Sequence, residues 1–213
     1  MRFGRILMDF FRQNRNKSDT KRKKVNSTEK FFEKLLELYE SRAAFFMKKW
    51  ERLLPFNEMI IDRWDKARRL GFGEGTSIYD STLVFGDVKV GKLTWIGPFT
   101  ILEGSGGGIV IGDYCSISTG VQIYTHDSVK WAVSGGKIEY EKAPTSIGNC
   151  VYIGPLSVIA KGVKKGDHCI IGAFSYVDRD IPDFSIVRGQ PANIVGRVWL
   201  NENGEVEYEH FDS

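Results

Sequence analysis

The sequence predicts a mainly β solenoid that follows an N-terminal α-helical segment. Residues 147–182 divide into six consecutive hexads, and position one of the hexad is a β-branched aliphatic residue in five of the six. Position two is small in five of six, and position five is always small or aliphatic. No amphipathic helix has a period of six, whereas a stack of coils with short flat faces buries one residue per hexad and turns at the small one.

The same frame can be followed through most of the second half of the chain. It begins at Ile78, continues in sixes to Leu102, resumes at Ile111 and breaks between Tyr124 and Ser146. We expect four to five coils of three hexads each. The glycine-rich stretch at 104–108 shifts the frame by three residues, and a flexible surface loop is expected there. Lys165 stands at an inward position, where its stem can pack inside while its head reaches solvent.

The segments outside the hexads have their own character. Residues 1–25 form a basic tail, because nine Lys and Arg stand against two acids in positions 1–24. Residues 26–73 read as a helical segment, with one helix over 26–54 that Asn26 caps and a second over 56–69. Residues 200–213 form a C-terminal tail with a hairpin turn at Asn203-Gly204.

Composition limits the cellular setting. The three cysteines, Cys115, Cys150 and Cys169, have no paired spacing, and two of them fall at inward positions, which favours buried thiols over a disulfide or a metal site. The sequence lacks a membrane-spanning apolar run and a secretory signal, so we expect a cytoplasmic protein. The apolar and basic residues 1–12 suit weak association with the inner membrane face, docking on a neighbouring subunit, or a frayed end. No nucleic-acid motif accompanies the basic charge.

One phosphate-binding motif is only apparent. Residues 86–92 read GDVKVGK, close to a P-loop, but Leu93 follows where Ser or Thr would bind magnesium. The segment also lies in the hexad frame, so we expect it in the solenoid wall.

The hexad run resembles the hexapeptide repeat of left-handed parallel β-helix proteins, most of which are acyltransferases. The resemblance covers roughly residues 76–199. It implies a left-handed parallel β-helix acyltransferase domain, and the whole chain is similar to bacterial sugar acetyltransferases of surface-polysaccharide pathways such as lipopolysaccharide biosynthesis.

The long interruption at 122–146 is the expected active-site loop. In the family, a catalytic histidine opens such a loop, and Thr125-His126-Asp127 matches that motif. Imidazole titrates near neutral pH, so His126 suits the general base that removes the acceptor proton during direct acyl transfer. Asp127, or alternatively Glu141, is expected to orient the ring.

The resemblance also implies the donor site. Acetyl-CoA would lie in a groove between neighbouring β-helices of a homotrimer, and no metal is expected. The family positions carried over to this chain for coenzyme A are Tyr152, Gly154, Gly172, Ala173, Arg179, Arg188 and Arg197. Arginines would meet the nucleotide phosphates, and the small residues would allow close backbone approach.

The expected acceptor is a sugar or a nucleotide-linked sugar, and the sequence leaves N-acylation and O-acylation open. Glu103, Tyr124 and Trp131 are the expected acceptor contacts. Two other functions remain as alternatives: a non-catalytic scaffold and a γ-carbonic-anhydrase-like metalloenzyme. The second needs three metal-binding histidines, and only His126 is suitably placed.

Overall fold

The computed structural model describes residues 27–211. The chain divides into two compact units, and the boundary in the sequence falls between Glu51 and Arg52. The first unit contains helix α2, Ser27–Trp50. Asn26, the expected cap, and the tail of residues 1–25 lie outside the described residues. The helix ends four residues earlier than expected, and Glu51 adopts a left-handed backbone with φ of 54°. No residue of α2 is buried.

The second expected helix is two helices, α3 (Phe56–Ile60) and α4 (Arg63–Arg69). Asp62 separates them because its backbone is extended, with φ of −75° and ψ of 127°. Its carboxylate accepts hydrogen bonds from the backbone N–H groups of Trp64 and Asp65, at 3.0 and 2.9 Å. Asp62 therefore starts a new helix as an N-cap residue, a change of direction that the hydrophobic pattern does not reveal.

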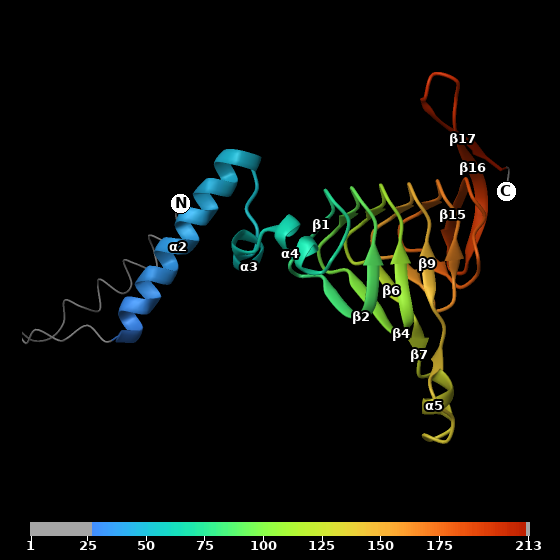
Figure 1. Ribbon diagram of the computed structural model, residues 1–213, viewed down its shortest axis with the longest axis horizontal. Helices are drawn as coiled ribbons and strands as arrows, with labels where there is room; N and C mark the ends of the chain where they lie inside the picture. The colour runs from blue at the N-terminus through green and yellow to red at the C-terminus, as the bar shows by residue number, and fades with distance from the viewer. Residues whose placement is uncertain (1–26, 212–213) are drawn as a thin grey trace, which may run out of the picture. The chain divides into compact units, whose positions relative to one another are not determined.

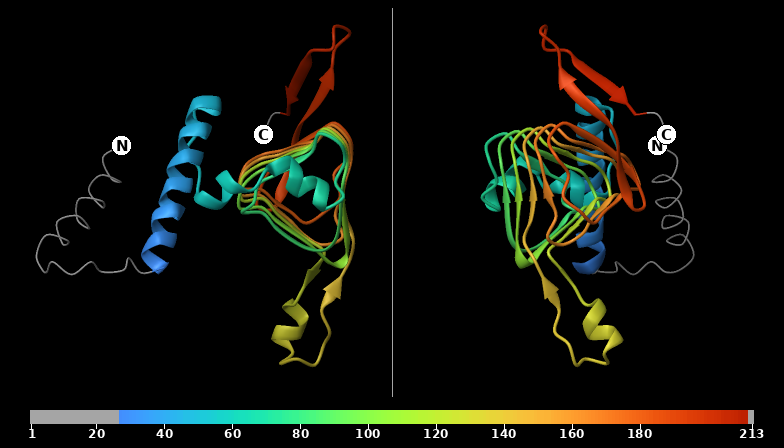
Figure 2. Two further views of the ribbon diagram at one scale, coloured as in Figure 1. Left: turned by 60° about the vertical axis from the view of Figure 1, so that its left-hand side comes forward. Right: turned by 90° about the vertical axis from the view of Figure 1, so that its right-hand side faces the viewer.

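These two short helices close the first coil of the solenoid, and α4 crosses its open end (Figure 2). Glu58 of α3 accepts from the backbone N–H groups of Asp80 and Ser81. The Lys66 ammonium donates to the carbonyls of Tyr79, Asp80 and Thr82, at 2.8–3.1 Å. The open end of a solenoid exposes apolar and backbone groups, and here charged side chains satisfy several of those backbone groups.

The solenoid is a left-handed parallel β-helix whose coils have three short faces, which gives the triangular outline in Figure 2. The strands of each face pair in parallel with those of the next coil (Figure 1). The first face comprises β1 (Ser77–Ile78), β3 (Trp95–Ile96), β5 (Ser116–Ile117), β10 (Tyr152–Ile153), β13 (Ile170–Ile171) and β15 (Ser185–Gly189).

The second face comprises the first halves of β2 (Leu83–Val90) and β4 (Ile101–Ile111), then β6 (Gln122–Tyr124), β11 (Val158–Ile159) and β14 (Tyr176–Val177). The third comprises the second halves of β2 and β4, then β9 (Thr145–Ile147) and β12 (Lys164–Lys165).

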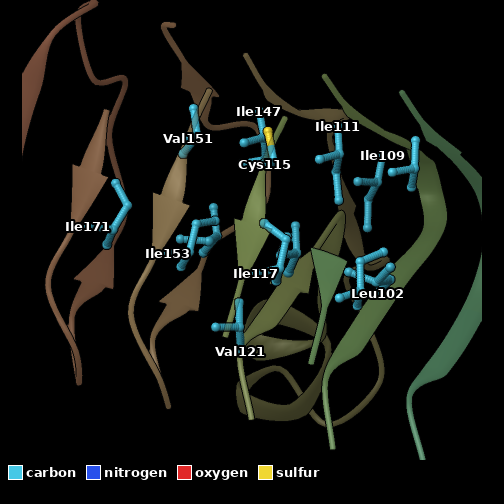
Figure 3. Packing of buried hydrophobic residues seen from close by; sticks show 14 of the residues in the cluster. Leu102, Ile109, Ile111, Cys115, Ile117, Val121, Ile147, Val151, Ile153 and Ile171 are labelled. Carbon is cyan, nitrogen blue, oxygen red and sulfur yellow. The ribbon is translucent and has the colours of Figure 1, made fainter. Parts of the chain in front are cut away.

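Position one of each hexad supplies the core, as predicted. Figure 3 shows these side chains stacked inside the coils, and Ile117, Ile123, Ile153 and Ile171 are fully buried. Each such residue contributes roughly 1.5–3 kcal/mol through burial. The small polar residues at position five are also buried, and their hydroxyls bond to carbonyls of the wall; Thr82 Oγ1, for example, donates to the Gly97 carbonyl at 2.9 Å.

Two expectations about the wall are wrong. Residues 104–108 are not a flexible loop, because β4 runs through them without interruption and pairs with β2 on both sides. The head of Lys165 does not escape to solvent: its Nζ atom is buried and has no hydrogen-bond partner among the described residues. The GDVKVGK segment does lie in the wall, within β2.

Two parts project from the coils. The insertion after β6 forms a ribbon of β7 (His126–Asp127) and β8 (Glu141–Lys142) with helix α5 (Val129–Val133) at its tip (Figure 2). At the other end, β16 (Ala192–Leu200) and β17 (Val206–His210) form an antiparallel hairpin around the expected Asn203-Gly204 turn. Within residues 27–211, no helix is long and apolar enough to cross a membrane.

Candidate active site

His126 lies where the chain leaves the second face of the third coil. It is the first residue of β7 and pairs with Lys142 of β8, so both ends of the insertion meet beside it. The Thr125 carbonyl accepts from the Ala143 N–H at 2.8 Å, which closes the neck of the insertion against the wall. The backbone of His126 is therefore fixed by strand pairing, although it belongs to a long insertion.

The imidazole is held by Glu103 of the preceding coil. Glu103 Oε2 lies 2.5 Å from His126 Nδ1, and the two side chains are only 11% and 28% exposed. Glu103 is itself fixed, because the backbone N–H and the hydroxyl of Ser105 both donate to Oε1. The sequence predicts Glu103 as a contact of the acceptor and Asp127 or Glu141 as the acid that orients the ring, whereas in the structure Glu103 contacts the ring.

Glu103 is therefore a carboxylate facing an imidazole. Burial alone would raise its pKa, but the hydrogen bonds from Ser105 and the attraction of His126 outweigh burial, and the pKa of Glu103 is lowered. A carboxylate accepts the proton on Nδ1, which leaves Nε2 as the basic ring nitrogen. This is the arrangement that a general base needs.

Asp127 and Glu141 bind lysines instead of the ring. Asp127 Oδ2 lies 2.5 Å from Lys161 Nζ, and Glu141 contacts Lys161 at 3.3 Å and Lys130 at 2.5 Å. The hydrogen bond from Lys161 lowers the pKa of Asp127, and the one from Lys130 lowers the pKa of Glu141. These two carboxylates form ion pairs with lysine ammonium groups, and the ion pairs hold the neck of the insertion.

The glycine-rich stretch is the floor beneath His126. A Cβ atom on Gly106 would lie 2.2 Å from the Thr125 carbonyl oxygen and 2.8 Å from His126 Cβ. The Gly106 N–H donates to Thr125 Oγ1 at 2.8 Å, and Thr125 Oγ1 donates to the Glu103 carbonyl. Glycine is needed here because the backbone of β4 and the neck of the insertion are in direct contact.

Aromatic rings line the insertion. Tyr140 stacks on His126, with ring centroids 6.0 Å apart and an interplanar angle of 5°. Trp131 of α5 meets Tyr140 edge-on at 5.6 Å, so one of the expected acceptor residues lies near the imidazole. Tyr124 donates its hydroxyl to Gln122 on the wall. The sequence does not predict Tyr140 as a site residue, because an insertion has no periodicity that would single out one of its side chains.

The residues expected to bind coenzyme A are spread over several coils. Gly154 and Ala173 are adjacent at one corner, since a Cβ on Gly154 would lie 2.5 Å from the Ala173 nitrogen. Gly172 precedes Ala173 and faces Arg188, whose Cβ would be 3.0 Å from an added Cβ. Tyr152 lies two residues before Gly154, in β10 of the first face, and lines a groove of about 290 Å³ together with Trp199 of the C-terminal hairpin.

The three arginines are on different elements. Arg179 follows β14, at the same corner at which His126 follows β6, because β6, β11 and β14 pair in sequence along one face. It is exposed and its Nε contacts Asp178 at 3.0 Å. Arg188 lies in β15 and Arg197 in β16, on the antiparallel extension of the first face. Arg179 is thus the arginine that shares a corner with His126.

The other histidines have separate surroundings. His168 lies at a corner before β13 and stacks on Phe184, at 4.9 Å with an interplanar angle of 4°. His210 is in the exposed strand β17. Within residues 27–211, no cluster of three or more His, Cys, Asp or Glu side chains has an arrangement that could hold a metal ion.

Known proteins share this repeat and fold. The family described as "Bacterial transferase hexapeptide (six repeats)" matches residues 144–179. Chloramphenicol acetyltransferase of Morganella morganii is 30% identical over 115 residues, 44% of this chain and 53% of its own. Galactoside O-acetyltransferase of Escherichia coli K12 is 31% identical over 97 residues, 42% of this chain and 47% of its own. The chain thus spans about half the length of these curated relatives.

A solved structure agrees with this comparison. A variant of AntD, an N-acyltransferase from Bacillus cereus in complex with dTDP and coenzyme A, superposes with a TM-score of 0.55 and is 26% identical. The match covers 59% of this chain and 72% of AntD. The chain thus carries a hexapeptide repeat over residues 144–179, folds as a left-handed parallel β-helix and is similar to acyltransferases.

Proposed function

We propose that the protein is a coenzyme A-dependent acyltransferase that transfers an acyl group, in the simplest case acetyl, to an amino or hydroxyl group of a sugar or nucleotide-linked sugar. The observation that carries the proposal is the 2.5 Å contact between His126 Nδ1 and Glu103 Oε2 at the neck of the insertion. It gives the imidazole a fixed orientation and leaves Nε2 as the base. The similarity to a galactoside O-acetyltransferase, and to an N-acyltransferase solved with dTDP and coenzyme A, supports the substrate class.

The reaction is a direct transfer. His126 Nε2 takes the proton of the acceptor N–H or O–H as its heteroatom attacks the thioester carbonyl. The tetrahedral intermediate collapses, the carbon–sulfur bond breaks, and the imidazolium returns the proton to the departing thiolate of coenzyme A. Glu103 stabilises the imidazolium through the bond to Nδ1, and backbone N–H groups near the coil corner stabilise the oxyanion. A positioned base contributes about 10²–10⁴-fold.

Two corners of the coils suit the donor: Gly154 and Ala173 follow the first face, and Arg179 follows the second face as His126 does. The glycine and alanine at 154 and 173 have no side chain beyond Cβ, so a pantetheine chain can approach the backbone there. Arg179 lies two coils beyond His126 on one corner, which is roughly 10 Å at the usual strand spacing. Its cation would meet phosphates at that end, and Trp131 and Tyr140 would cover the acceptor sugar. We assign Arg188, Arg197 and Tyr152 a weaker part, because they do not share the corner of His126.

The assembly is also a proposal. A homotrimer with donor grooves between subunits follows from the family resemblance, and light scattering should then give a mass near three times 24.1 kDa; a monomeric mass contradicts it. The cytoplasmic location and the contact of residues 1–12 with a membrane surface rest on the sequence alone.

The deciding experiment measures thiol release from acetyl-CoA with a panel of nucleotide-linked amino sugars and neutral sugars. We expect release with at least one acceptor and a fall of about 10²–10⁴-fold in His126→Ala, while His168→Ala, the matched control at another corner, stays near the original protein. Release only on amino sugars indicates N-acylation. Release that survives His126→Ala removes the proposed base, and no release together with no coenzyme A binding by calorimetry favours the scaffold.

A further inference from the structure

Lys161 joins both strands of the neck of the insertion to the solenoid wall. It follows β11, one coil beyond β6, at the corner from which the insertion leaves. Its Nζ atom lies 2.5 Å from Asp127 Oδ2 on β7 and 3.3 Å from Glu141 Oε2 on β8. These two acids are paired across the ribbon. One ammonium group therefore contacts a carboxylate on each strand.

The neck is thus held from both neighbouring coils. Glu103 of the preceding coil contacts His126, and Lys161 of the following coil contacts Asp127, the next residue in the chain. Asp127 also accepts from the Val129 N–H at 3.0 Å, which connects this contact to the start of α5. Two successive residues of β7 are consequently fixed from opposite directions, and the imidazole lies between the two contacts.

Lys161 is well placed for this role because it is partly removed from solvent. Its side chain is 25% exposed and that of Asp127 is 34% exposed, compared with 57% for Lys130, which binds Glu141 from the same ribbon. The ordering of a long lysine side chain is favoured where two carboxylates share it, since isolated surface pairs contribute little.

We propose, on the basis of the function proposed above, that Lys161 is a positioning residue: it holds the ribbon of Asp127 and Glu141 against the wall and so keeps His126 at the reacting atoms. Lys161 acts through Asp127 and touches no substrate. Removing it should misplace the imidazole without altering the donor groove, and misplacement of about 1 Å costs about 10²-fold in rate.

The kinetic test compares Lys161→Met, Lys161→Arg and the control Lys164→Met, whose exposed lysine lies three residues further on the same coil. We expect kcat to fall roughly 10–100-fold in Lys161→Met with the KM for acetyl-CoA within about 2-fold, and substantial rescue in Lys161→Arg. Lys164→Met should behave like the original protein. A rise in KM at constant kcat, or equal losses in Met and Arg variants, overturns the proposal.

A second measurement does not depend on any enzymatic activity. Chymotrypsin cleaves after aromatic residues, and Trp131 and Tyr140 lie in the insertion. If Lys161 fixes the neck, cleavage there should accelerate several-fold in Lys161→Met and in Asp127→Asn, and the double variant should gain little over Lys161→Met alone, because both changes act on the Lys161–Asp127 contact. If cleavage is unchanged in a folded Lys161→Met protein, the positioning role is refuted. If cleavage accelerates in Lys161→Met but the original protein shows no transferase activity, only the proposed function is refuted.

Discussion

The regular wall at 147–182 and the corner around His126 are built in opposite ways. In the wall, position one is an inward-pointing aliphatic residue in five of the six hexads, and these residues pack together in one core, so the pattern repeats with the chain. At the corner, Glu103, His126 and Lys161 come from three successive coils and are polar, partly buried and paired by charge. The comparison teaches that the repeat supplies a rigid frame, and that specific chemistry appears where adjacent coils depart from it.

Lys165 is the one place within the described wall where a charged residue occupies an inward position without a hydrogen-bond partner. Lys66, at the capped end, shows the alternative, because it donates to three carbonyls. Burial lowers the pKa of Lys165 to about 7. The amine is therefore close to half protonated at neutral pH, although its Nζ atom has no hydrogen-bond partner among the described residues.

The largest effect is expected from Lys165→Met, which removes this group and preserves its volume. In the unfolded chain lysine keeps its proton up to about pH 10.4, so between pH 7 and 10 the unfolded state binds more protons and the original protein becomes more stable as pH rises. We expect the variant to gain on the order of 4 kcal/mol at or below pH 7, with the gain vanishing near pH 10.

Urea unfolding at pH 6.5, 8 and 9.5 measures this. Lys164→Met, a change at the adjacent exposed position, should alter the free energy of unfolding by less than about 0.5 kcal/mol at each pH. A Lys165→Met protein that is less stable than the original at pH 6.5 would show that Lys165 has a partner in solution.

The second effect concerns the floor of the corner. Gly106→Ala should lower kcat by about 10²-fold, because its Cβ would be 2.2 Å from the Thr125 carbonyl oxygen and must displace His126. Gly135→Ala is the comparison, since the residue lies in the insertion and an added Cβ there meets nothing within 4 Å; its φ of +65° strains an alanine, but no neighbouring atom has to move. Steady-state kinetics on both variants test this prediction. Equal kcat values would mean that the close contact between Gly106 and the neck of the insertion does not position His126.

Much of the fold could be predicted from the sequence, and the reason is visible in the wall. A repeated hexad can be checked within the sequence itself, because successive coils place aliphatic residues at the same inward position. The solenoid and the place of His126 at the start of an insertion follow from that register. The break at Asp62 could not be predicted from hydrophobic periodicity, because it depends on a side chain that caps α4.

The partners within the site could not be predicted, because they lie in adjacent coils and are far apart in the sequence. Asp127 is next to His126 in the chain, yet β-strand geometry turns consecutive side chains to opposite faces, and Asp127 meets Lys161 instead. Glu103 occupies position two of its hexad, where five of the six hexads at 147–182 have Gly or Ala, but Tyr79, Phe85, Ser118 and Tyr124 also depart from that pattern, so the deviation does not single out Glu103. Lys161 carries no comparable deviation.

The central claim is that Glu103, not Asp127, holds the imidazole through Nδ1. Nitrogen-15 NMR of the imidazole rings tests it directly, because the chain has three histidines and His126 can be assigned by comparison with His126→Gln. At a pH where the ring is neutral, we predict that His126 carries its proton on Nδ1, that Glu103→Leu, which removes the acceptor, abolishes this preference, and that Asp127→Asn preserves it. A proton on Nε2, or a preference lost in Asp127→Asn and kept in Glu103→Leu, would contradict the account.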